Sequence, residues 1–202
     1  MSALGLIGSV TNRGAQTYIS GIGTLNQPAS GSVSISEFRN GPLVVTTFTL
    51  TAARISVTDG AGSGSYGSLL LYTLPAGAIC TLGARQNYTA FAEGAALTGG
   101  AGDAVFVVAV GTENISAAAD GILSTNYKDV GSAVQITLSG GTGAGAIVSG
   151  SYDNAPSPAF DGTDTAIKFY LNWSGTAATI DANSTIDVTG TITIAWLFLG
   201  DD

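Results

Sequence analysis

The chain has 202 residues, of which 45% are hydrophobic and 10% are charged, and its formal net charge is −8. Its length suffices for one substantial hydrophobic core, and its apolar content excludes the charge-rich, apolar-poor type of disordered chain. The six basic residues are scattered singly, which excludes the basic face that nucleic-acid binding requires.

Residues 1–31 are predicted to form an extended, glycine-rich N-terminal arm, followed by a single β-sandwich domain over residues 32–202. Glycine stands at positions 5, 8, 14, 21, 23 and 31, and apolar residues show little sustained alternation in this segment. Two alternatives stay open for it, a disordered terminus and an arm that becomes ordered by lying on a neighbouring subunit. The first ten residues lack the basic start of a secretory signal.

Beyond the arm, apolar residues recur at every second position, which is the period of a strand with one buried face. Strands are predicted at 33–38, 43–51, 67–74, 79–91, 104–110, 133–138, 165–173 and 186–198. The one predicted helix is a turn or two at 116–119. About eight strands with short turns and no helical crossovers predict an all-β antiparallel sandwich, jelly-roll-like in its layout.

Two local features refine this pattern. In the last strand Gly190 interrupts the apolar face, which indicates a bulge or a close backbone approach. The longest purely apolar run, residues 104–110, is far shorter than the ~20 residues that cross a bilayer, so no membrane span is predicted.

Reactive groups are scarce. The absence of histidine and the single cysteine, Cys80, exclude Cys/His zinc sites and nucleophilic sites that use a histidine base. Cys80 is expected to be a buried, inert thiol. Asp153, Asp161 and Asp164 share the loop 151–165, where paired carboxylates could act as acid and base or, with Asn154, hold a calcium ion. The favoured interpretation is solvated turn residues, so we expect no catalytic residue, no cofactor and no metal.

Two further patterns have structural explanations. Residues 141–146, GTGAGA, imitate a dinucleotide-binding fingerprint, but residues 147–150 are predicted as strand or loop, not as a helix that could present amide groups to a pyrophosphate, so a glycine-rich linker is expected. Trp173 and Trp196 could form a sugar-stacking platform, yet both lie on the apolar face of an alternating strand. Packing in the core is therefore the favoured role of both tryptophans.

Two segments combine turn residues with long apolar strands. Residues 55–79 read ISVTDGAGSGSYGSLLLYTLPAGAI, and residues 161–174 read DGTDTAIKFYLNWS. These segments resemble a group of tailed-bacteriophage virion structural proteins of the capsid decoration or head-fibre type. The resemblance covers residues 54–202 and rests on turn chemistry joined to strands, not on reactive side chains.

The resemblance implies a β-sandwich that assembles, usually as trimers, on a symmetric particle. The implied partners are copies of the chain and the major capsid protein of a phage head, on the exterior of the virion after synthesis in the host cytoplasm. The low charge agrees with this, because a surface covered by subunit contacts needs fewer charges to stay soluble. We expect a non-enzymatic protein that decorates or stabilises a capsid; the alternative is a receptor- or glycan-binding module of a virion fibre.

Overall fold

The computed structural model describes residues 18–19, 22–60, 64–93, 104–117, 122–138, 145–151, 159–175 and 182–200. Its strands pair antiparallel and join in one continuous 12-stranded sheet, which confirms the predicted all-β antiparallel fold. In chain order the strands are β1 (Tyr18–Ile19), β2 (Thr24–Leu25), β3 (Ser32–Asn40), β4 (Leu43–Asp59), β5 (Ser65–Thr73), β6 (Ala78–Glu93), β7 (Ala104–Gly111), β8 (Gly131–Leu138), β9 (Gly145–Ser151), β10 (Ala159–Asp161), β11 (Lys168–Gly175) and β12 (Ser184–Gly200).

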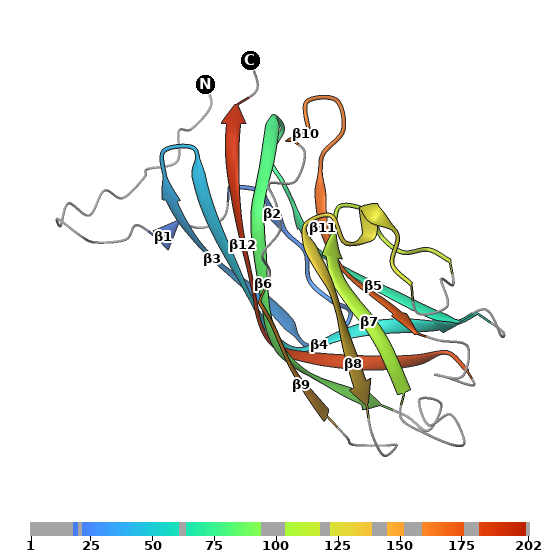
Figure 1. Ribbon diagram of the computed structural model, residues 1–202. Coiled ribbons are helices and arrows are strands. Elements are labelled where there is room, and N and C mark those ends of the chain that lie inside the picture. The colour runs from blue at the N-terminus through green and yellow to red at the C-terminus, as the bar shows by residue number, and fades with distance from the viewer. Residues whose placement is uncertain are drawn as a thin grey trace.

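The sheet curls, so that its two halves face each other across the core (Figure 1). One half contains β3, β4, β12, β6 and β9 as successive neighbours, and the other contains β5, β11, β7 and β8. The halves are continuous because β4 bends and its last residues, 57–59, pair with residues 65–67 of β5. This layout is compatible with the predicted jelly-roll-like sandwich.

The eight predicted strands correspond to β3–β8, β11 and β12. Three strands of only two or three residues were not predicted, namely β1, β2 and β10, and β9 decides the open alternative of strand or loop at residues 147–150 in favour of a strand. The predicted helical turn is wrong at residues 116 and 117, and residues 118–119 lie outside the described part of the chain. The N–H of Ile115 instead donates to the Asn172 side chain, and the one described helical turn is the 3-10 turn η2 (Thr125–Tyr127).

The core confirms the alternation of β12. Its inward residues are fully buried, namely Ile186, Val188, Ile192, Ile194 and Trp196. Trp173 of β11 is also fully buried and packs edge-to-face on Phe106, with ring centroids 5.6 Å apart. Both tryptophans therefore lie in the core as predicted, where each contributes a large apolar area to folding.

A bulge at Gly190 confirms the second local prediction. The pairing of β12 with β4 shifts between Val188 and Gly190, and Gly190 has a φ of +148°. A Cβ at this position would lie 2.4 Å from the Asn87 carbonyl oxygen, closer than van der Waals contact allows. On β4 the shift is taken up at Ala52, whose φ of +45° is rare for a residue with a side chain.

The end of the predicted arm is attached to the sheet at the open edge between the two halves. β1 pairs with β3 of one half, and β2 pairs with β5 of the other. Gly23 fits only because it lacks a side chain, since a Cβ there would lie 2.2 Å from the Thr73 carbonyl oxygen. Residues 18–19 and 22–25 thus contact the two halves, while the boundary of the arm at residue 31 stays a prediction.

A fully buried carboxylate holds residues 22 and 23 in place. Glu37 accepts hydrogen bonds from the Ile22 N–H at 2.9 Å, the Thr46 hydroxyl at 2.8 Å and the Tyr72 hydroxyl at 3.0 Å. The Gly23 N–H donates to the Tyr72 oxygen. Burial raises the pKa of Tyr72 well above its ordinary value, and the nearby Glu37 raises it further, so the hydroxyl stays protonated and remains a donor.

Candidate interaction surface

The predicted acidic loop is solvated where the structure describes it. Asp161 and Asp164 are exposed, and Asp161 Oδ1 accepts from the Thr163 N–H at 3.0 Å and the Thr163 hydroxyl at 2.6 Å. These two bonds lower the pKa of Asp161 below its ordinary value. Asp153 and Asn154 lie outside the described residues. Within the described ranges no three His, Cys, Asp or Glu side chains lie close enough to hold a metal ion together.

Three other expectations have structural outcomes. The dinucleotide-like stretch leads into the strand β9, which pairs with β6, so no helix N-terminus follows it. The expected linker is wrong at residues 145 and 146, which already belong to β9, and residues 141–144 lie outside the described part. Cys80 is only half-buried, contrary to expectation, because its side chain alternates outward from the buried Ile79 and Thr81.

The β5–β11–β7 layer has its outer side covered by the chain itself. Residues following β7 place Ile115 and Leu123 against Ala109, and these three buried residues form a second small core. Tyr66, Val107 and Tyr127 pack around them. Consequently residues 171–175 of β11 are buried on both faces, and even the polar residues Asn172 and Ser174 are buried.

Asn172 pins this covering segment with both ends of its side-chain amide. Its Oδ1 accepts from the Ser68 hydroxyl at 2.9 Å and the Ile115 N–H at 3.1 Å. Its Nδ2 donates to the carbonyl oxygens of Glu113 at 2.8 Å and Tyr127 at 3.0 Å. Every hydrogen-bonding direction of this buried amide is used, so Asn172 is a structural residue.

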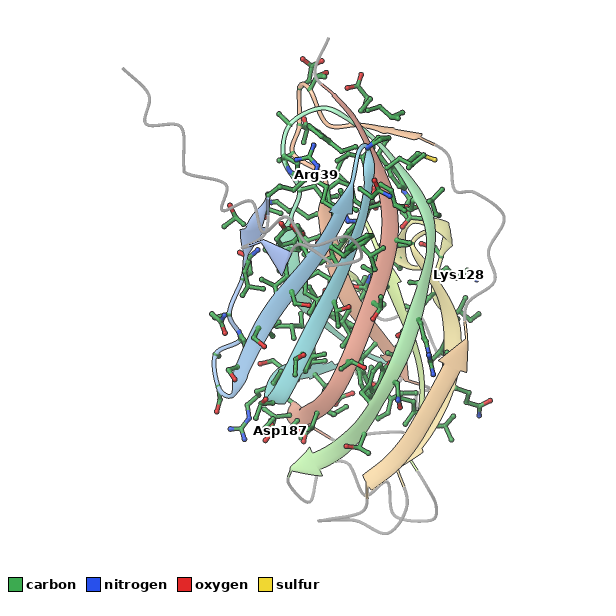
Figure 2. All side chains as sticks on the ribbon, turned by 90° about the vertical axis from the view of Figure 1, so that its left-hand side faces the viewer. Arg39, Lys128 and Asp187 are labelled. Atoms are coloured by element: carbon green, nitrogen blue, oxygen red, sulfur yellow. The ribbon has the colours of Figure 1, made fainter. Side chains whose placement is uncertain are left out.

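The opposite layer has no such covering segment among the described residues. Figure 2 looks onto the outward side of β3, β4, β12 and β6, which we call the outer face, with Arg39 near one end and Asp187 near the other. Strand register arranges its side chains in five rows across these four strands, and the second and fifth rows each cross a β-bulge. From the Arg39 end these rows contain Asn40, Leu43, Leu197 and Cys80; Phe38, Val45 and Ala195, with the exposed Leu82 next to Gly83, the β6 partner of Ala195; Ser36, Thr47, Thr193 and Arg85; Ser34, Thr49, Thr191 and Asn87; and the pairs Ser32–Thr51 and Thr189–Thr89, which flank the bulge between β4 and β12.

The outer face therefore has an apolar end, made by the first two rows, and a hydroxyl end, made by the last three. Several hydroxyls are already bonded within the sheet. Thr47 Oγ1 and Thr193 Oγ1 lie 3.1 Å apart across β4 and β12. Thr189 Oγ1 accepts from the Ala52 N–H at 2.9 Å, and the Thr89 hydroxyl donates to the Thr189 carbonyl oxygen at 3.3 Å. Because these groups have partners, removing them from water costs less than burying bare hydroxyls.

Charge is nearly absent from the outer face. Within its five rows Arg85, at the β6 edge, is the one charged side chain. Beyond the last row Arg54 and Asp187 form a two-pronged ion pair, with nitrogen–oxygen distances of 2.8 Å and 2.9 Å. This pair neutralises the charges next to the last row, so Arg85, at the β6 edge of the face, is the one charge within the five rows that a covering partner has to leave in water or pair.

Comparisons with known proteins add nothing to this picture. No protein-family model, no curated protein and no solved structure matches the chain. None of the helical turns in the described residues is long and apolar enough to span a bilayer. The outer face is consequently the main structural feature that indicates a function.

Proposed function

We propose that the chain is a non-enzymatic structural subunit of a virion that decorates or stabilises a bacteriophage capsid through subunit contacts. The observation that carries this proposal is the outer face, an array of mainly apolar and hydroxyl side chains on four adjacent strands with Arg85 as its one charged member. The resemblance of residues 55–79 and 161–174 to tailed-phage virion proteins supports the same role. Copies of the chain and a major capsid protein are the proposed partners.

The mechanism of such a subunit is burial of surface at many joints. Each joint gains roughly 25 cal/mol per Å² of apolar area removed from water. A lattice holds many joints at once, so contacts that are weak singly become strong together. The described part of the chain fits this use, because Asp161 lies in an exposed turn, Asp187 is paired with Arg54, and both tryptophan rings are buried in the core.

The alternative, a receptor- or glycan-binding fibre module, has weaker support. Such modules present exposed aromatic rings for stacking on sugars. Trp173 and Trp196 are fully buried, as are Tyr72 and Tyr88. A specific hit on a glycan array with the full chain would favour this alternative.

Direct binding to heads tests the proposal. The purified full chain is mixed with undecorated heads of tailed phages, and the particles are imaged by electron microscopy with symmetry averaging. Added density that follows the lattice symmetry is the expected result. Particles without added density across the heads tested would count against a capsid role.

A further inference from the structure

We propose that two copies of the chain pack outer face to outer face, with a twofold axis that runs along the strands β4 and β12. This inference rests on the proposed function and names its first subunit contact. It starts from an asymmetry: residues of the chain, held down by Asn172, cover the outer side of the β5–β11–β7 layer, whereas none of the residues that the structure describes covers the outer face.

The size of the outer face suits a second copy. Neighbouring strands lie about 4.8 Å apart, and residues on the same side of a strand lie about 6.7 Å apart, so each position covers about 32 Å². Five rows of four positions then give roughly 640 Å² per copy. Two copies bury up to about 1,300 Å² together when the curved faces meet along their full length, which reaches the lower part of the roughly 1,200–2,000 Å² range of stable protein interfaces. The apolar end alone is too small.

The direction of the twofold axis follows from the layout of the rows. With the axis along the strands, β4 of one copy faces β12 of the other. Leu43 then meets Leu197, Val45 meets Ala195 and Thr47 meets Thr193 of the second copy. An axis across the strands would instead place the apolar end on the hydroxyl rows, which would bury hydroxyls against carbon. The strand-parallel axis keeps like surfaces together, and it aligns the two sheets as in sandwich packing.

Charge favours the same face. Each copy carries a formal net charge of −8, so two copies repel wherever their acidic residues approach. The five rows contain no acidic side chain, and Asp187 just beyond the last row is paired with Arg54, so the described residues of the outer face let two copies meet without bringing carboxylates together. Added salt screens the remaining long-range repulsion, so association should strengthen as ionic strength rises.

Cys80 provides a native probe, because it is the single cysteine of the chain and lies half-buried in the first row. Sedimentation of the full chain across a concentration series gives the monomer–dimer equilibrium, and maleimide labelling of Cys80 is followed at the same concentrations. We expect a dimer at high concentration and a labelling rate that falls in step with dimer formation. A dimer that leaves the labelling rate unchanged, or a monomer throughout the series, would overturn the inference.

Two substitutions locate the contact. Val45→Asp places a charge at the centre of the apolar end, and we expect it to weaken the dimer at least about 10-fold. Leu70→Asp is the matched control, because Leu70 is a half-buried leucine on β5 of the other layer, and it should leave the dimer unchanged. Should Val45→Asp lower the melting temperature, Ser34→Arg at an exposed hydroxyl position serves instead. Equal dimerisation of the outer-face and control variants would refute the assignment.

Binding to heads separates this inference from the proposed function. Ordered density on heads together with an intact dimer in Val45→Asp would retain the capsid role and reject the outer face as the self-contact. If Val45→Asp disrupts the dimer but the native chain adds no density to heads, the self-contact is retained and the capsid role is rejected.

Discussion

Removal of the buried Glu37 carboxylate is expected to weaken both the fold and the attachment of residues 22 and 23. Alanine at this position takes away the shared acceptor of Tyr72, Thr46 and the Ile22 N–H. A buried donor without an acceptor costs about 1–3 kcal/mol, and the Tyr72 and Thr46 residues are fully buried. We expect Glu37→Ala to lower the free energy of unfolding by about 3–5 kcal/mol, a large share of the roughly 5–15 kcal/mol of a typical domain.

Urea unfolding followed by tryptophan fluorescence measures this loss, since Trp173 and Trp196 report on the core. Faster hydrogen exchange at the Ile22 and Gly23 amides is the second expected result. Glu37→Gln is the matched control: it keeps one acceptor oxygen but adds an amide donor, and it should cost about 1–2 kcal/mol. A loss under about 1 kcal/mol in Glu37→Ala, or equal losses in both variants, would show that the carboxylate does not hold residues 22 and 23 in place.

Three further substitutions test the local geometry. Asn172→Asp should destabilise more than Asn172→Ala, because a carboxylate would face two carbonyl oxygens; the expected loss is at least about 3 kcal/mol, with faster proteolysis of the segment that follows β7. Ala52→Gly should stabilise by about 0.5–1 kcal/mol in urea unfolding, because its φ of +45° suits glycine, whereas a loss would contradict the strain. Burial raises the pKa of Asp129 above 3.8, although bonds from Thr112 oppose this, so the folded state binds the proton more tightly than the unfolded state. The stability contributed by this group should therefore be lost as pH rises above 3.8 through the raised pKa. Over the same pH window the free energy of unfolding of Asp129→Asn should rise relative to that of the native chain. A difference between the two free energies that does not change with pH would contradict the raised pKa of Asp129.

The strands were predictable because alternation and burial share one physical cause. In β12 a side chain on every second residue must be apolar to enter the core, so the spacing of Ile186, Val188 and Trp196 is enough to identify the inward face. Gly190 was equally informative, since a glycine in the middle of a strand weakens it unless the backbone requires that glycine.

Other parts of the fold depend on contacts between residues distant in sequence. The continuation of β4 past residue 51 requires Ala52 to adopt a left-handed backbone conformation, and the presence of an alanine in a sequence does not predict this conformation. The placement of β1 and β2 on opposite halves depends on the distant Glu37 and Tyr72, whose polar groups gave no sign that they would be buried. Two- and three-residue strands carry too few positions for any periodicity.

The outer face was only half visible in the sequence. Threonine at 189, 191 and 193 marks the outward side of one strand, and the same period recurs as threonine at 47, 49 and 51 and as serine at 32, 34 and 36. This alternation identifies the outward side of each strand, but it does not predict the strand register that places the three runs beside one another. That register comes from long-range pairing, chiefly Thr49 with Thr191 and Ser34 with Thr49.

The choice of threonine and serine for this face has a physical rationale that links solubility to assembly. Threonine is β-branched and favours strands, so these rows help to form the sheet that presents them. A hydroxyl keeps the surface wetted without a charge, and where it bonds within the sheet, as at Thr47 and Thr193, less of its hydrogen bonding is lost when water leaves. Lysine or glutamate rows would make the same face more soluble, but they would carry a desolvation penalty of several kcal/mol per ion on contact. A hydroxyl-rich face is therefore suited to a protein that is soluble before it is covered.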